Sequence, residues 1–140
     1  MVSKGWLFYM YKKLKKRDFN AVLEYLPYFK DKTNSYYTIE KGNFNDPFRY
    51  SSKVYQFLDT LQKHDFIIVF DHPSWQSEAL KYIENPKLLK SVGLLTLRKL
   101  LTLHIRKERF CSGHLASVID TGHLVKIFER LKELKTNLKD

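Results

Sequence analysis

The sequence predicts an α+β fold: one mostly helical domain with a small two- to three-stranded sheet in its N-terminal half and a C-terminal helical hairpin. Apolar residues recur at the helical period over long stretches of the second half. Short runs of β-branched and aromatic residues, bounded by Gly, Asn and Pro, lie before residue 71. We expect a single domain over 1–140, with a basic, aromatic segment at 1–17 and the globular core at 18–137.

The N-terminal half should begin with a short helix and two short strands. Asp18 is suited to cap a helix that Pro27 would end. The β-branched and aromatic residues at 36–39 and 48–50 favour strands. A Gly-Asn-Phe-Asn-Asp-Pro turn at 42–47 separates them.

A longer helix and a third strand are expected next. Ser51 or Ser52 would cap the helix, whose apolar pattern ends near His64. The continuous apolar run at 66–70 is typical of a buried strand.

The second half should be helical. Ser74 has the position of an N-cap, and Asn85-Pro86 is typical of the start of a short helix. Gly93 precedes the longest helical pattern, and Gly122 separates the last two. We expect one helix to end near 84 and a short one to start at 86. Three more should span 94–110, 114–121 and 123 to about 137.

The composition is that of a basic globular protein. Hydrophobic residues make up 44% of the 140, which suffices for a core without metal or disulfide. The net charge of +10 favours contact with a polyanion, although a basic surface can also serve solubility alone. A single cysteine, and no visible signal peptide or membrane-spanning run, predict a cytoplasmic protein with no transmembrane segment.

A dense run of cations follows several aromatic residues near the N-terminus. Such a combination could contact nucleic acid or an anionic membrane, or form the polar face of a first helix. No glycine-arginine repeat or RNP-type aromatic motif accompanies it. The cations are Lys12, Lys13, Lys15, Lys16 and Arg17.

The side chains best suited to act as acids, bases or ligands lie between positions 104 and 114. His104 and Glu108 are one helical turn apart on an otherwise aliphatic stripe, with His114 beyond. Burial and a neighbouring carboxylate shift the pKa of an imidazole in opposite directions, and such shifts can adjust the pKa of a general acid or base. The alternative, which we favour, is a core histidine whose polar atoms are satisfied inside the protein.

Three arginines are predicted to share one helix face. Arg98, Arg106 and Arg109 could bind a phosphate or carboxylate bidentately. They could equally pair with acidic residues on other elements, namely Asp65, Asp71 or Glu78.

Metal binding has only a weak signal. Cys111 and His114 form one Cys-x-x-His spacing, which His104 and His123 could complete as zinc ligands. No second closely spaced pair is present, and no Asn or Asp is placed to orient a Cys-His nucleophilic dyad. We therefore expect no cofactor.

The chain resembles a bacterial family of small proteins whose function is not known. The resemblance runs from about Phe19 to Leu134. It is carried by Leu23-x-Tyr25-x-Pro27-x-Phe29, Tyr50-Ser51 with Val54 and Phe57, Phe70-Asp71 with Trp75, Glu78-Ala79 and Tyr82. Its most specific segment is Leu97-Arg98-Lys99-Leu100-Leu101-Thr102-x-His104-x-Arg106-x-x-Arg109-Phe110-Cys111-x-Gly113-His114-Leu115. The resemblance implies the fold boundaries and no activity, substrate or cofactor.

These observations favour a small, basic, non-enzymatic binding or regulatory protein that acts on a macromolecule, either nucleic acid or a protein partner. The arginine cluster and the cations of residues 12–17 would make the contacts. The alternative is a small enzyme or ligand-binding domain with a His/Glu/Arg pocket around residues 104–114.

Overall fold

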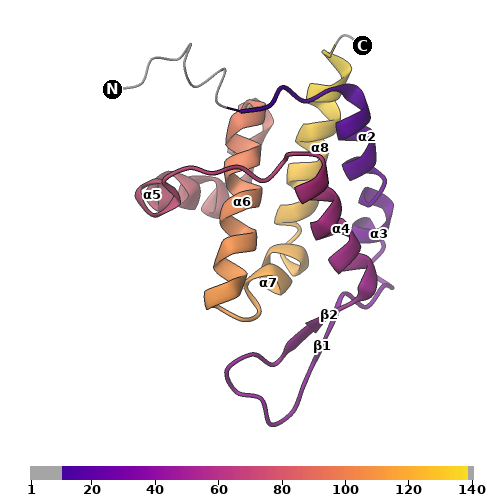
Figure 1. Ribbon diagram of the computed structural model, residues 1–140, viewed down its shortest axis with the longest axis vertical. Helices are drawn as coiled ribbons and strands as arrows, with labels where there is room; N and C mark the ends of the chain where they lie inside the picture. The colour runs from indigo at the N-terminus through magenta and orange to yellow at the C-terminus, as the bar shows by residue number, and fades with distance from the viewer. Residues whose placement is uncertain (1–10, 139–140) are drawn as a thin grey trace.

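The computed structural model describes residues 11–138 and confirms a mostly helical α+β domain (Figure 1). No helix within that range combines the length and apolar character needed to cross a bilayer. In chain order the elements are α2 (Lys16–Leu23), α3 (Leu26–Lys30), β1 (Tyr37–Ile39), β2 (Phe48–Tyr50), α4 (Ser52–Lys63), α5 (His72–Glu84), the 3₁₀ helix η1 (Pro86–Ser91), α6 (Leu94–Phe110), α7 (His114–Asp120) and α8 (His123–Thr136).

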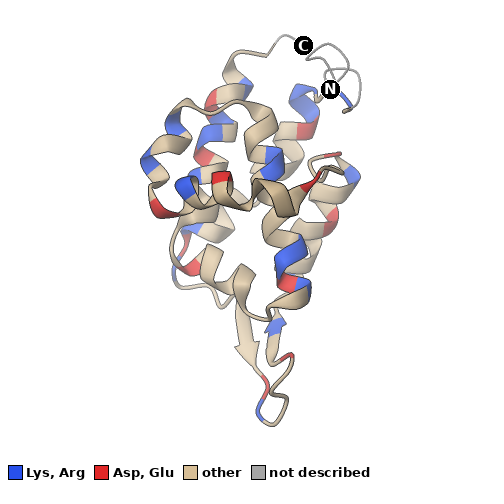
Figure 2. Ribbon diagram, turned by 90° about the vertical axis from the view of Figure 1, so that its left-hand side faces the viewer, with Lys and Arg blue, Asp and Glu red and all other residues tan. Residues whose placement is uncertain are grey.

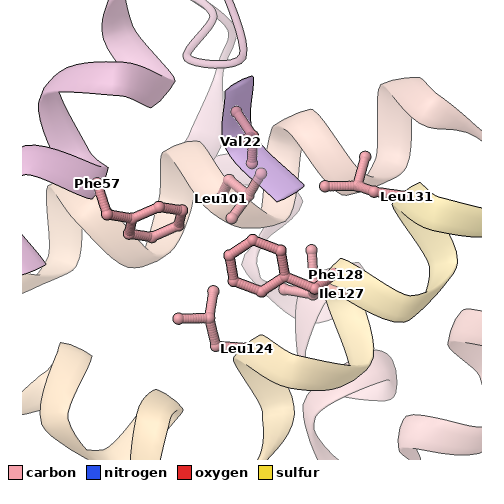
Figure 3. Close-up of a pocket in the computed structure, with 7 residues that line it drawn as sticks. All are labelled: Val22, Phe57, Leu101, Leu124, Ile127, Phe128 and Leu131. Carbon is pink, nitrogen blue, oxygen red and sulfur yellow. The ribbon is translucent and has the colours of Figure 1, made fainter. Parts of the chain in front are cut away.

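The hydrophobic core lies where α2, α4, α6 and α8 meet. The rings of Phe29, Phe57 and Phe128 form its centre, with ring centroids 5.0 to 5.7 Å apart. Burying each such side chain contributes about 1.5–3 kcal/mol. Figure 3 shows core side chains that point toward one another and leave no space for a water molecule: Val22, Phe57, Leu101, Leu124, Ile127, Phe128 and Leu131.

The two strands form a hairpin that projects beyond the lower end of the helices (Figures 1 and 2). Both strands were predicted, and they pair antiparallel with Tyr37 opposite Tyr50. Side-chain hydrogen bonds attach the hairpin to the helices and to the corner between α6 and α7. Tyr37 donates to Asp120 Oδ2 at 2.6 Å, and Ser112 donates to Asp46 Oδ1 at 2.9 Å. Tyr50 donates to Glu108 Oε1 at 2.6 Å. The hairpin therefore lies beside the corner between α6 and α7.

The long helices begin where their capping residues predict. Ser51 Oγ accepts a hydrogen bond from the backbone N–H of Val54, which caps α4. Gly93 precedes α6, which spans the predicted residues. Gly122 separates α7 from α8 and has a φ of 81°, in the left-handed region that glycine adopts at low cost.

Three predicted helix boundaries were wrong. The first helix begins at Lys16 with Lys15 at the cap position, so Asp18 lies in the first turn, where it accepts from the backbone N–H of Lys15. Pro27 does not end the first helix, because α2 already ends at Leu23 and Pro27 lies in the first turn of α3. A proline is tolerated there because the missing N–H has no partner inside a helix. The cap of α5 is Asp71, which accepts from the backbone N–H of Ser74, so Ser74 is the donor and not the cap.

The predicted strand at 66–70 was also wrong. The segment has no hydrogen-bonded neighbour strand, because the sheet of the described residues contains β1 and β2 alone. Phe66 and Ile68 are buried, but Val69 is 71% exposed. The backbone N–H of Ile68 donates to Thr102 Oγ1 of α6 at 3.0 Å, which replaces the bond a strand neighbour would accept.

Candidate functional site at the end of helix α6

Three histidines from three consecutive helices pack together. His104 of α6 is 2% exposed, and its Nδ1 lies 2.9 Å from Nε2 of His114, the first residue of α7. The ring of His123, the first residue of α8, meets His104 edge-on with centroids 5.1 Å apart. Within residues 11–138, Nε2 of His104 and both ring nitrogens of His123 have no hydrogen-bond partner.

All three imidazoles are held neutral. Burial, followed by neighbouring positive groups, lowers the pKa of His104 well below its ordinary value and that of His123 to about 4. Burial also lowers the pKa of His114, although the nearby charge of Glu108 opposes the effect. Desolvation therefore outweighs the charge interaction that would tune one of these histidines as a base.

Glu108 does not pair with His104. Its carboxylate accepts hydrogen bonds from the backbone N–H groups of Leu115 at 2.8 Å and Gly113 at 3.0 Å, and from the hydroxyl of Tyr50 at 2.6 Å. The first N–H groups of a helix lack partners within it, and a carboxylate there also favours the helix dipole. Glu108 is thus bound to the start of α7.

Arg98 lies apart from the other two arginines and is buried. Its guanidinium donates to the backbone carbonyls of Lys12, at 3.1 Å, and Asp65. Burial lowers its pKa. Because a helix rises about 1.5 Å per residue, Arg98 is about 16 Å from Arg109 along the axis of α6. Its hydrogen bonds hold the chain around residue 12 and the loop after α4 on the start of α6.

The side chains of Arg106, Lys107 and Arg109, by contrast, form no ion pair or hydrogen bond with any residue of 11–138. The acidic side chains that sequence analysis offered as alternative partners are engaged elsewhere. Asp65 pairs with Lys12, Asp71 caps α5, and Glu78 pairs with Lys81.

Phe110, the last residue of α6, is 88% exposed and lies between two hollows in the surface. One hollow has a volume of about 320 Å³ and separates the hairpin from α6. The other, of about 240 Å³, lies toward α5 and is lined by Arg106 and Lys107. We call Arg106, Lys107, Arg109 and Phe110 the α6-end surface.

The cysteine and histidines do not form a metal centre. Cys111 is exposed and lines the hollow toward α5, while His114 turns inward to His104. Among residues 11–138, no three His, Cys, Asp or Glu side chains are placed to hold one metal ion.

The basic run at 12–17, which ends in the first turn of α2, lies at the other end of α6, next to Arg98 (Figure 1). Lys12 pairs with Asp65 at 3.1 Å, and Lys13, Lys15 and Arg17 are exposed. Lys16 is partly buried. The first ten residues of the predicted aromatic, basic segment lie outside the described residues.

Figure 2 shows that Lys and Arg are spread over several helices from one end of the molecule to the other. The run at 12–17 and the α6-end surface are accordingly two separate basic regions.

Sequence reasoning missed the contribution of the hairpin to this site. Tyr50 bonds to Glu108, and Arg49 and Tyr55 line the hollow beside Arg109. The pattern around these residues predicted a strand and a helix but carried no sign of what they would face. Only the pairing of Tyr50 with a residue 58 positions away makes them part of the site.

Comparison with protein families matches residues 14–137 to a family described as a family of unknown function, DUF6508. No curated protein and no solved structure matches the chain.

Proposed function

The chain belongs to DUF6508, and from its own geometry we propose that it is a non-enzymatic protein that binds single-stranded nucleic acid at the α6-end surface. We place this activity in the bacterial cytoplasm, where the exposed thiol of Cys111 would stay reduced. The observation that carries the proposal is an exposed aromatic ring, Phe110, directly next to cations that have no acidic partner.

The charges of this surface suit phosphate. Arg106, Lys107 and Arg109 are close in sequence at the end of one helix, and none is neutralised by a carboxylate of residues 11–138. Guanidinium groups bind phosphate oxygens bidentately, and neutralised phosphates release counterions. The position at the negative end of the helix dipole also stabilises these cations, but it gives no reason for the exposed ring beside them.

Phe110 suits an unpaired base. A phenylalanine at 88% exposure leaves the face of its ring in water, where a base can reach it. Bases of a single strand stack on aromatic rings, whereas the bases of a duplex are already stacked on one another. An aromatic ring flanked by cations is therefore better matched to a single strand than to a duplex.

The catalytic alternative has less support. His104 is sealed in the core and lines neither hollow, and the carboxylate of Glu108 is engaged by Leu115, Gly113 and Tyr50. A general acid or base must reach a substrate proton, which His104 could do only after the corner had opened. Glu108 lines the hollow between the hairpin and α6, but both of its oxygens already accept hydrogen bonds.

The basic run at 12–17 would make a second, weaker contact with a strand long enough to pass along the molecule. Lys13, Lys15 and Arg17 are exposed there, but no exposed aromatic residue among 11–138 accompanies them. Lys12 and Arg98 would contribute less, because each already has a partner.

Fluorescence anisotropy with labelled single-stranded DNA and RNA, titrated with salt, tests the proposal. We expect binding that weakens steeply between about 50 and 200 mM salt. The double substitution Arg106→Gln and Arg109→Gln should reduce the slope of log K against log salt by about 1.4, the value for two single-strand phosphates. Phe110→Ala should weaken binding about tenfold, which corresponds to one stacked base.

A charge-matched control comes from η1, at the other end of the molecule. Lys87→Gln with Lys90→Gln removes the same two charges from exposed positions and should leave the affinity nearly unchanged. The proposal is overturned if the wild-type protein binds neither nucleic acid at low salt. Equal losses in the control and in the arginine variant would also overturn it, because the binding would then follow net charge alone.

A further inference from the structure

The hollow between the hairpin and α6 has walls from three elements. Hairpin residues Phe48 and Tyr50 form one side, Tyr55 of α4 a second, and Phe110 the third, at the end of α6. We call this space of about 320 Å³ the hairpin hollow. Its volume is at the lower end of the range for small-molecule sites in proteins, so it suits one planar group and not a large ligand.

The walls of the hairpin hollow are largely aromatic. Tyr50 stacks against Phe48 with centroids 6.5 Å apart, and Tyr55 meets the Tyr50 ring edge-on at 6.2 Å. Tyr55 is 51% exposed, so a face of its ring remains open to an incoming group. Flat rings around a space of this size favour a flat, polarisable ligand.

Most charged groups of the hollow already have partners. Arg49 pairs with Glu40 at 2.7 Å, Asp46 accepts from Ser112, and Glu108 binds the start of α7. Because the carboxylates of Asp46 and Glu108 line the hollow, a phosphate inside it would be repelled. A neutral group is favoured in the interior, and an anion is favoured only at the rim near Arg109.

Three groups of the hollow make no hydrogen bond within residues 11–138. They are the side-chain amide of Asn45, the hydroxyl of Tyr55 and the guanidinium of Arg109. An amide and a hydroxyl can each donate and accept, as the polar edge of a nucleobase requires. Arg109 can bind the phosphate that follows such a base along the strand.

The hollow is held in shape without a ligand. Tyr37 and Ser112 tie the hairpin to the helices, and Phe48 packs against the backbone of Gly113. Little ordering of the walls is therefore needed when a ligand enters, which favours binding.

We infer that the hairpin hollow receives one unpaired nucleobase of the bound strand, stacked against Tyr55 and Phe110, with the adjacent phosphate on Arg109. The inference rests on the proposed function, because that function supplies the strand. It adds that one base is held inside the hairpin hollow, against Tyr55, and not on the exposed ring of Phe110 alone.

A strand without bases, used together with the Tyr55→Ala variant, separates the two statements. Anisotropy is measured with a single-stranded oligonucleotide and with an abasic one of equal length and charge, at one low salt concentration. The wild-type protein should bind the normal strand about tenfold more tightly, the effect of one stacked base. Tyr55→Ala should remove most of this difference and leave abasic binding unchanged, and Asn45→Ala should reduce the difference by a smaller factor.

Two controls accompany these variants. Phe44→Ala removes the neighbouring hairpin aromatic, which is 95% exposed and does not line the hollow, and it should leave both affinities unchanged. Arg109→Gln should weaken both strands. Circular dichroism of each variant checks that it is folded, and Tyr55 is half-exposed, so its truncation leaves the core intact.

Equal wild-type affinities for the normal and abasic strands overturn the inference and also the stacking of a base on Phe110, so that only the phosphate contacts of the proposed function remain. If Tyr55→Ala keeps the full wild-type preference for the normal strand while Phe110→Ala loses it, the inference is overturned and the proposed function stands. Equal losses on both strands in Tyr55→Ala also overturn the inference, because the side chain would then not act on a base. If the wild-type protein binds neither strand, the proposed function fails, and the inference fails with it.

Discussion

The hydroxyl of Tyr50 lies 2.6 Å from Oε1 of Glu108 and joins the hairpin to the corner between α6 and α7. The same hydroxyl accepts a hydrogen bond at 3.0 Å from the backbone N–H of Ala116, in the first turn of α7. Burial, followed by the bond to Glu108, raises the pKa of Tyr50, so the phenol keeps its proton. The hydroxyl, acting as one donor and one acceptor, thus connects β2 to residues of α6 and α7 that lie 58 and 66 positions away in the sequence.

Removing the carboxylate of Glu108 should destabilise the protein without creating a cavity in the hydrophobic core. Glu108→Ala leaves the N–H groups of Gly113 and Leu115 and the Tyr50 hydroxyl without their acceptor, and we expect a loss of about 3 kcal/mol in the free energy of unfolding. Glu108→Gln keeps one carbonyl acceptor and should lose about half as much. Urea denaturation measures both. A Glu108→Ala variant as stable as the wild type would show that water replaces the carboxylate at no cost.

Gly113 should tolerate no side chain, and Gly122 provides the comparison. Both have positive φ values, 95° and 81°, which cost about 1–2 kcal/mol for alanine. A Cβ on Gly113 would also overlap the ring of Phe48, whereas a Cβ on Gly122 meets no atom within 4 Å. Gly113→Ala should therefore lower the free energy of unfolding by about 3 kcal/mol or more, and Gly122→Ala by about 1–2 kcal/mol. Thermal or urea unfolding measures both variants. If Gly113→Ala and Gly122→Ala lose the same free energy of unfolding, Phe48 and the hairpin move away from the new side chain at no cost.

The helices were predictable because their signals are local. The period of apolar residues and a preceding glycine are enough to define α6, and Ser51 followed by an apolar stripe is enough to define α4. The run at 66–70 was misread because an apolar stretch shows burial and not what satisfies its backbone. Its acceptor is Thr102, which lies 34 residues from Ile68 in the sequence.

The sequence indicated which residues to consider for the candidate site, but not their connections. Helical spacing correctly placed His104 and Glu108 one turn apart on α6, and it grouped Arg98 with Arg106 and Arg109. Spacing cannot show that the start of α7 offers free N–H groups to Glu108, or that the carbonyls of Lys12 and Asp65 converge on Arg98. These partners come from distant segments, so only the folded chain distinguishes the buried Arg98 from Arg106, which is partly exposed, and Arg109, which is exposed.

The cluster of His104, His114 and His123 should make stability depend on pH. The pKa of His123 is about 4 in the folded protein and 6.5 as an ordinary side chain, so the unfolded chain binds more protons below pH 6.5. The contribution is fully present above pH 6.5 and is lost as the pH falls toward 4. His104 and His114 act in the same direction, because burial lowers the pKa of each.

Between pH 7 and pH 5, His123 alone should cost about 2 kcal/mol of the free energy of unfolding. His123→Leu should flatten this dependence and be at least as stable as the wild type at pH 7, because both ring nitrogens are buried without partners within residues 11–138. His72→Gln changes a histidine outside the cluster and should retain the full dependence. Urea unfolding at several pH values measures all three proteins. If His123→Leu keeps the wild-type slope, acid must act on the fold through other groups, because a neutral leucine cannot take up the proton that opens the cluster.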